Sequence, residues 1–227
     1  MRFRTLILDF DSTLVQIESL ELLAQISLAT VPNRQERYQQ IKALTEAAME
    51  GKISFAEALE KRIQLLQAYA HHLPVLIDQL RRLYTPSLLR NLPQLLDPDW
   101  DVYVFSGGFI EFIVPVLHPL GFAPDRIFAN RFVANAQGKI IGVDPSVPLA
   151  TDEGKVRLAQ QLSLHTPILV VGDGYNDYEL RKAQIAQCFA AFVENVRRPP
   201  VVAVADWVVE SFDHLMEAVQ QCAEESQ

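Results

Sequence analysis

Short apolar runs alternate with amphipathic stretches along most of the chain. Three of the runs, at residues 5–9, 102–105 and 168–171, end directly at polar or glycine-rich segments. Two later runs, at residues 188–193 and 206–209, have the composition of further strands of the same sheet. Strands that alternate with helices predict an α/β fold of three layers, in which helices cover a mostly parallel, Rossmann-like sheet. Ligands of such sheets bind beyond the carboxyl ends of the strands.

The pattern changes between residues 15 and 83. This segment is rich in Leu, Ala, Gln and Glu, and its apolar residues recur at three- and four-residue steps, as in residues 38–48. The spacing predicts a helical insert after the first strand. We therefore expect a core domain formed by residues 1–14 and 84–227, and a helical cap formed by residues 15–83.

Two local patterns refine this outline. Ser54, followed by Glu57, is typical of a capping box that opens a helix, and an apolar stripe begins at Phe55. Further along, a Gln-Gly pair lies between two β-like runs within residues 128–142, which predicts a hairpin.

Composition and charge exclude several function classes. Hydrophobic residues make up 49% of the 227-residue chain, enough for a substantial core. The net charge of -8 argues against a nucleic-acid-binding surface. The N-terminus runs straight into a strand without a signal-peptide pattern, and no apolar stretch approaches membrane-spanning length. Only two cysteines are present, without a CxxC pair. We therefore expect a soluble, cytoplasmic protein with neither nucleic-acid nor membrane partners.

Two carboxylates one residue apart, Asp9 and Asp11, come at the end of the first apolar run. Burying two acids beside a strand costs free energy unless a cation or another partner compensates. A carboxylate can attack phosphorus, and a neighbouring acid can protonate the leaving oxygen. In this interpretation Asp9 is the nucleophile and Asp11 the general acid and base. For this pair alone, a solvated turn at the strand end is the alternative.

Two further segments offer groups that could hold a phosphate. Ser106, Gly107 and Gly108 follow the run at residues 102–105 without a gap, so a hydroxyl and unobstructed amides would meet the same sheet edge. Lys155 opens an amphipathic helix, and its cation could hold a transferring phosphoryl group. Taken alone, the first segment could be an ordinary strand-to-helix turn and the lysine could be solvated.

The most specific segment is Gly-Asp-Gly-Tyr-Asn-Asp at residues 172–177, which brings Asp173 and Asp177 to the same edge. Mg²⁺ prefers oxygen ligands and keeps several waters, so one or two carboxylates plus a phosphate oxygen suffice. Asp173 would be a direct ligand, and Asp177 would bind through water or anchor the site. An EF-hand is excluded because its spacing and terminal Glu are missing, and a dinucleotide site because no strand is followed by GxGxxG.

In this order the four segments resemble the haloacid dehalogenase superfamily of phosphohydrolases, over nearly the whole chain. Within that superfamily the chain is most similar to the phosphoserine phosphatases. The similarity lies in DFDSTLV at residues 9–15, MEGKISF at residues 49–55, SGGF at residues 106–109 and FANR at residues 128–131.

The resemblance implies a Mg²⁺ cofactor held by four acidic residues: Asp9, Asp11 (through its main-chain carbonyl), Asp173 and Asp177. It implies a phosphate site built from polar groups at the same edge: Ser106, Gly107 and Lys155, beside Asn176. In the cap, Glu18 would bind a substrate ammonium, Arg62 would bind a carboxylate, and Phe55 would close over them. These residue types suit those partners. The alternative is that Phe55 is a core residue and the two charged side chains are solvated.

The favoured hypothesis is a Mg²⁺-dependent phosphomonoesterase, a monomer or homodimer, that releases serine from O-phosphoserine through an aspartyl-phosphate and serves serine biosynthesis. Tyr175 stands where phosphoserine phosphatases usually have a small residue, and the Thr85-Pro86 step lacks the glycine that commonly follows it. Another small phosphomonoester, or phosphoryl transfer to an acceptor, therefore stays open. A catalytically idle relative with a binding or regulatory role is disfavoured by the complete set of acids and Lys155.

Overall fold

The computed structural model of the protein describes residues 1–225. Six strands form one parallel sheet in the order β3-β2-β1-β6-β7-β8. The strands are β1 (Thr5–Leu8), β2 (Asp101–Phe109), β3 (Ile127–Asn130), β6 (Ile168–Gly172), β7 (Cys188–Phe192) and β8 (Trp207–Val209). In the three central strands Leu8 lies between Val104 and Val171, so the polar segments that follow meet at one edge.

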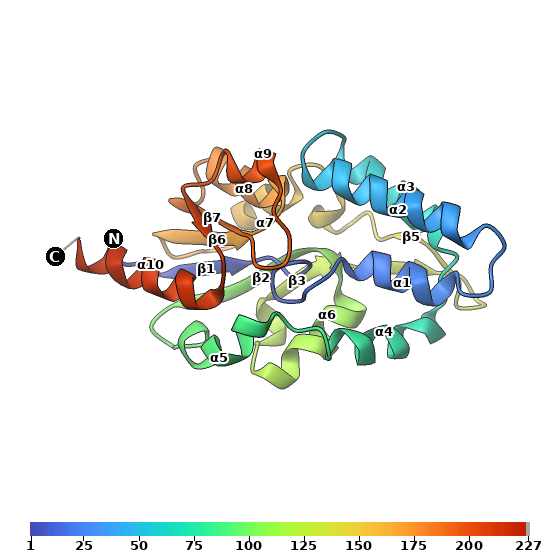
Figure 1. The fold of residues 1–227 in the computed structure, drawn as a ribbon, viewed down its shortest axis with the longest axis horizontal. Helices are drawn as coiled ribbons and strands as arrows, with labels where there is room; N and C mark the ends of the chain where they lie inside the picture. Colours follow the sequence, from blue (N-terminus) through green and yellow to red (C-terminus); the bar gives the residue numbers. More distant parts are fainter. Residues whose placement is uncertain (226–227) are drawn as a thin grey trace.

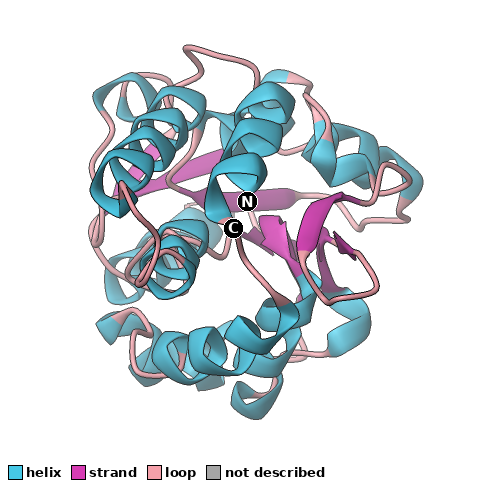
Figure 2. Cartoon of the chain, turned by 90° about the vertical axis from the view of Figure 1, so that its right-hand side faces the viewer, coloured by secondary structure: helices cyan, strands magenta, loops and turns pink. Residues whose placement is uncertain are grey.

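Helices cover both faces of this sheet (Figures 1 and 2). One face carries α5 (Pro86–Leu95), α6 (Ile110–Leu117) and α10 (Phe212–Glu224), and the other carries α7 (Gly154–Gln161), α8 (Tyr175–Lys182) and α9 (Pro199–Val202). The side chains of β1 alternate accordingly, because Leu6 and Leu8 belong to the first hydrophobic cluster and Ile7 to the second. The predicted three-layer α/β fold is confirmed.

Residues 15–83, called the cap segment below, are helical as their spacing predicts. Their helices are α1 (Ser19–Ser27), α2 (Arg34–Met49), α3 (Phe55–Leu66) and α4 (Leu73–Leu80). Helices α2 and α3 pack against each other, α3 also contacts strand β5, and α4 contacts α6 of the core. Figure 1 shows α2 and α3 beyond the end of the sheet where the polar segments meet. Whether the cap segment is a separate domain stays a prediction.

Helix α3 begins where the sequence predicts. The Ser54 hydroxyl accepts a hydrogen bond from the Glu57 amide at 3.2 Å, which satisfies one of the free N–H groups of the first turn. Leu59, Ile63 and Leu66 are buried along one side of the helix. Phe55, the first residue of α3, is half-buried and reaches the core edge described below.

The predicted hairpin is shorter than expected. Phe128 belongs to β3 and pairs in parallel with Phe105 of the main sheet. Only β4 (Phe132–Ala134) and β5 (Ile140–Val143) form the antiparallel pair. A continuous β-like run hides this division, because the chain leaves the sheet after Asn130 without a glycine to mark the break.

No helix among residues 1–225 is both long and apolar enough to span a bilayer.

Candidate active site

Three buried acids and one lysine meet at the carboxyl edge of the sheet. Asp9, Asp173 and Asp177 each offer a carboxylate oxygen, and these atoms lie within 4.8 Å of one another. The Lys155 ammonium lies 2.7 Å from Asp9 Oδ1 and 2.5 Å from Asp177 Oδ1. Burial favours the neutral form of the lysine, but the two carboxylates outweigh it and raise the pKa of Lys155 above its ordinary value.

The donor set of this cluster suits a hard divalent cation. Burial raises the pKa of Asp173 well above its ordinary value, and the negative charge of Glu18 adds to the effect. Burial likewise raises the pKa of Asp177 to about 7, against the opposing effect of Lys155. Ionising these buried carboxylates costs free energy. A bound cation that prefers oxygen ligands would reduce that cost. Asp9, Asp173 and Asp177 could therefore hold Mg²⁺.

The Asp11 side chain points away from this cluster, toward the start of α1. Its two oxygens accept hydrogen bonds from the Ser19 amide at 3.0 Å and the Ser19 hydroxyl at 2.9 Å. Burial raises the pKa of Asp11 well above its ordinary value, and the charges of Glu18 and Asp9 raise it further. A raised pKa favours the protonated form of the carboxyl group, which is the form that a general acid uses.

A tight turn follows β2 at the same edge. The Ser106 hydroxyl accepts a hydrogen bond from the Gly108 amide at 2.9 Å, and the Asn130 side-chain amide donates to the Gly107 carbonyl at 2.9 Å. A Cβ atom on Gly107 would lie 2.5 Å from the Phe55 ring, so the ring of the cap segment rests directly on this glycine. Only glycine allows that approach.

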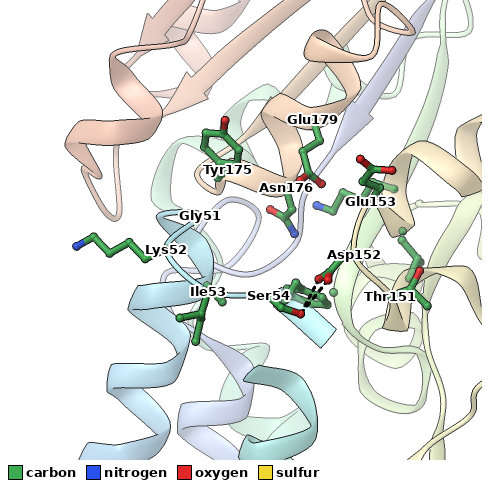
Figure 3. Close-up of a pocket in the computed structure, with 16 residues that line it drawn as sticks. Gly51, Lys52, Ile53, Ser54, Thr151, Asp152, Glu153, Tyr175, Asn176 and Glu179 are labelled. Carbon is green, nitrogen blue, oxygen red and sulfur yellow. Dashed lines mark hydrogen bonds between the residues drawn. The ribbon is translucent and has the colours of Figure 1, made fainter. Parts of the chain in front are cut away.

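Core and cap segment together enclose a small inner cavity of about 10 Å³. Its lining includes three residues from each side: Asp9, Asp11 and Ser106 from the core, and Met49, Phe55 and Arg62 from the cap segment. A second cavity of about 340 Å³, called the outer cavity, adjoins it (Figure 3). Phe55, Gly107 and Asn176 line both.

Arg62 is buried in the wall of the inner cavity. One guanidinium nitrogen lies 3.3 Å from the Thr45 hydroxyl, Nε lies 3.4 Å from the Ala58 carbonyl, and the group sits 5.8 Å from the centre of the Phe55 ring. Burial lowers the pKa of Arg62, while the charge of Glu18 opposes that effect. A guanidinium with neutral neighbours at hydrogen-bond distance is well placed to take a carboxylate partner.

Arg198 connects three segments that are far apart in the sequence. Its guanidinium contacts Asp173 Oδ2 at 3.0 Å, Glu18 Oε1 at 3.1 Å and Glu46 Oε2 at 2.5 Å. The Ser12 hydroxyl donates to the same Glu18 oxygen at 2.8 Å. Burial raises the pKa of Glu18, and Arg198 partly offsets this. Arg198 therefore neutralises a predicted metal ligand and a predicted substrate ligand together.

The sequence and the fold have relatives among known proteins. The model of the haloacid dehalogenase-like hydrolases matches residues 6–182 of the 227-residue chain. The chain belongs to the haloacid dehalogenase-like hydrolase family.

Relatives of this hydrolase are phosphoserine phosphatases. It is 31% identical to the phosphoserine phosphatase of Idiomarina loihiensis over 234 residues, covering 98% of this chain and 94% of that protein. It is 29% identical to the chloroplastic phosphoserine phosphatase of Arabidopsis thaliana over 214 residues, covering 93% and 70% respectively. The crystal structure of a phosphoserine phosphohydrolase-like protein from Francisella tularensis superposes with a TM-score of 0.87 at 27% identity, covering 95% and 99%. The predicted resemblance to this family is confirmed. The prediction that the protein is a phosphoric monoester hydrolase is confirmed as well.

Most of the predicted site residues lie close together in the folded hydrolase. The inner cavity joins residues from every predicted group: Asp9, Asp11, Ser106, Gly107, Phe55, Arg62 and Asn176. Asn176 Oδ1 is buried and has no hydrogen-bond partner within residues 1–225, which leaves it available to a ligand. Glu18 does not line this cavity, and its carboxylate contacts Arg198 and Ser12 instead. The Asp11 carboxylate is bound to Ser19, and the predicted contact of its main-chain carbonyl with the metal stays a prediction.

Little in the sequence points to Arg198 and Glu46. Arg198 lies in a loop next to Arg197 and just before two prolines, which is typical of a solvated turn, and Glu46 is one of several glutamates on α2. The only usable signal was electrostatic. Several buried acids call for more positive charge than Lys155 alone supplies, and no local pattern identifies Arg198 as a source of it.

Proposed function

We propose that this hydrolase cleaves O-phosphoserine to serine and phosphate, with Mg²⁺ as cofactor and an aspartyl-phosphate intermediate. One observation carries the proposal: Arg62 of the cap segment and the Asp9 and Ser106 groups of the core line the same small cavity. A cation that can bind a carboxylate and an edge that can bind a phosphate thus line one cavity. A small phosphorylated amino acid carries both of these groups. The names of the relatives support the same substrate.

Asp9 attacks phosphorus and forms the aspartyl-phosphate, while the serine oxygen leaves and takes the proton of Asp11. Asp11 then accepts a proton from water, which attacks the phosphorus of the intermediate and regenerates the Asp9 carboxylate. Lys155 and the Ser106 turn hold the phosphoryl oxygens throughout. Mg²⁺ held by Asp9, Asp173 and Asp177 would offset the repulsion between the phosphate and these acids.

The positions of Tyr175 and Glu18 bear on the choice of substrate. Tyr175 contacts Gly51 of the cap segment, since a Cβ atom on Gly51 would lie 2.9 Å from its ring, and it lines the outer cavity. Figure 3 shows it beside Gly51. The ring is not among the residues that line the inner cavity. Glu18 is held by Arg198 and Ser12 and does not line that cavity either, so its binding of the substrate ammonium stays a prediction.

The test is a phosphoester panel with the Arg62→Ala variant. We expect kcat/KM for phosphoserine to fall about 100-fold, the value of a charge-assisted pair. For phosphoethanolamine, which has the ammonium but no carboxylate, it should fall less than about threefold. Lys61→Ala, one residue away and exposed, is the matched control, and Asp9→Asn gives the inactive baseline.

Equal losses on both substrates would remove the specificity role of Arg62. If another phosphomonoester or transfer to an acceptor is clearly faster in the wild-type protein, that activity replaces the proposal. Binding without turnover of any panel member would indicate a non-catalytic relative. The predicted cytoplasmic setting, the role in serine biosynthesis and the monomeric or dimeric state stay predictions.

A further inference from the structure

Asp152, in the core, caps a helix of the cap segment. It lies in the loop that leads into α7, and its carboxylate accepts the Ser54 hydroxyl, with oxygen distances of 3.0 Å and 2.8 Å. The Ala56 amide donates to Asp152 Oδ1 at 3.2 Å. Figure 3 shows the Ser54 and Asp152 side chains joined across the outer cavity. The Asp152 carboxylate thus caps the N-terminus of α3, although Asp152 comes 96 residues after Ala56 in the sequence.

This contact stabilises the first turn of α3. The first N–H groups of a helix have no partner within it, and a negative charge there is favoured by the helix dipole. Ser54 donates to Asp152 while its oxygen accepts from the Glu57 amide. Asp152 therefore satisfies the Ala56 amide directly and fixes the hydroxyl that satisfies the Glu57 amide.

The same turn carries a residue that closes the inner cavity. Phe55 lies between Ser54 and Ala56, and its ring rests on Gly107 of the phosphate turn. Two turns further, the Arg62 guanidinium lies over that ring. A shift at the start of α3 would move both side chains relative to the phosphate turn.

On the core side, Asp152 is rigidly joined to Lys155. The Thr151 hydroxyl donates to the Pro148 carbonyl at 2.7 Å, and Glu153 adopts a left-handed conformation with φ of 55°. Gly154 packs so closely that a Cβ atom would lie 2.5 Å from the Pro148 carbonyl oxygen. Such a loop allows little independent movement between Asp152 and Lys155.

We propose that Asp152 is a positioning residue that couples closure of the cap segment over the inner cavity to the loop that delivers Lys155. The kinetic part of this inference rests on the proposed function, whereas its structural part does not. Asp152 touches no reacting atom in this role. It acts through Ser54 and the first turn of α3.

The structural test is amide hydrogen exchange of the peptide that covers residues 51–59, in the Asp152→Ala and Asp152→Asn variants. We expect exchange at the Ala56 and Glu57 amides to rise about tenfold in Asp152→Ala, the value of a lost helix cap. Asp152→Asn keeps an oxygen acceptor and should stay within about threefold of wild type.

Asp144→Ala is the matched control. Asp144 also accepts from a serine hydroxyl and a backbone amide, both of Ser146, but within a single core loop. Unchanged exchange in Asp152→Ala, or an equal rise in Asp144→Ala, would overturn the proposal whether or not phosphoserine is a substrate.

The kinetic test uses phosphoserine with the same variants. We expect KM to rise about tenfold in Asp152→Ala while kcat changes less than about twofold, because saturating substrate draws the cap segment into its closed position. In Asp152→Asn, KM should lie close to the wild-type value. A fall in kcat at unchanged KM would contradict a positioning role. If no phosphoserine is turned over at all, the proposed substrate fails and hydrogen exchange alone decides the role of Asp152.

Discussion

At the scale of single residues, Asp9 and Asp11 form a pair in the sequence but have different partners in the structure. Asp9 has the Lys155 ammonium at 2.7 Å, whereas Asp11 has only the amide and hydroxyl of Ser19. Burial without a cationic partner at hydrogen-bond distance raises the pKa of Asp11. The two acids, two positions apart, thus differ in their partners, with a cation beside Asp9 and neutral groups beside Asp11.

Glu21 on α1 gives a pH-dependent prediction for stability. Burial raises its pKa from 4.5 to about 7, and the charge of Glu18 adds to this. The unfolded chain then loses this proton at lower pH than the folded protein, so the ionised carboxylate destabilises the fold increasingly from pH 4.5 to 7. Glu21→Gln removes that cost. We expect it to gain about 1–2 kcal/mol over wild type at pH 8, a value reduced for the partial exposure of Glu21.

The measurement is urea unfolding of both proteins at pH 4.5, 6 and 8. The advantage of Glu21→Gln should fall to a few tenths of a kcal/mol (~0.4) at pH 4.5, where the carboxyl is protonated in the folded protein and about half protonated in the unfolded chain. Glu60→Gln, an exposed position on α3, is the control and should show no such pH trend. An advantage of the same size at every pH would show that titration of Glu21 is not its cause.

At the scale of elements, the site is assembled from the ends of strands and the first turns of helices. Asp9 follows β1, Asp173 follows β6, and Asp177 lies in the first turn of α8. There Asp177 accepts a hydrogen bond from the Gly174 amide at 3.0 Å. Helix α8 begins at Tyr175, and this bond caps its N-terminus. The other oxygen of the capping carboxylate contacts Lys155.

Metal binding at this junction should stabilise the fold. We expect added Mg²⁺ to raise the thermal midpoint of the wild-type protein, with about 1.4 kcal/mol gained at ten times its dissociation constant. In Asp173→Asn the shift caused by Mg²⁺ should be lost, because a charged oxygen ligand is replaced by a neutral one. The measurement is a thermal melt with Mg²⁺ and with a chelator. Equal Mg²⁺ shifts in both proteins would place the metal elsewhere.

At the scale of the whole molecule, the cap segment and the core meet around the site through several separate contacts. Arg198 reaches Glu46 of α2, Asp152 reaches Ser54, and Tyr175 rests on Gly51. These contacts surround the place where Phe55 lies on Gly107. The inner cavity is therefore small because the two parts are closed on each other, and substrate entry requires some of these contacts to open.

Gly107→Ala tests this closed arrangement. The new methyl group would lie 2.5 Å from the Phe55 ring, so the ring and α3 must move. We expect kcat/KM for phosphoserine to fall roughly 100-fold, the usual consequence of displacement by about 1 Å in a catalytic site. Phe55→Leu in the same background should recover part of the loss, since the smaller side chain leaves room.

Gly142→Ala is the matched control, because a Cβ atom there meets nothing within 4 Å. Its activity should equal that of wild type. If Gly107→Ala behaves like Gly142→Ala, or if Phe55→Leu adds to the loss, the contact between the ring and the glycine does not limit closure.

Local sequence patterns were enough to predict the layered fold and most of the reactive edge. Strand and helix periods are local, and parallel strands end at a common edge, so Asp9, Ser106 and Asp173 could be placed together before any contact was known. The break after β3 was missed, because no local signal separates it from the hairpin.

The pairing of the buried charges and the contacts that hold the cap segment could be predicted only from the folded structure. Arg198 and Glu18 are 180 positions apart, and Asp152 and Ser54 are 98 apart. Nothing in the local pattern of a loop arginine or a loop aspartate specifies such partners. Pairing depends on burial and on distances across the closed molecule, and these exist only once the chain has folded.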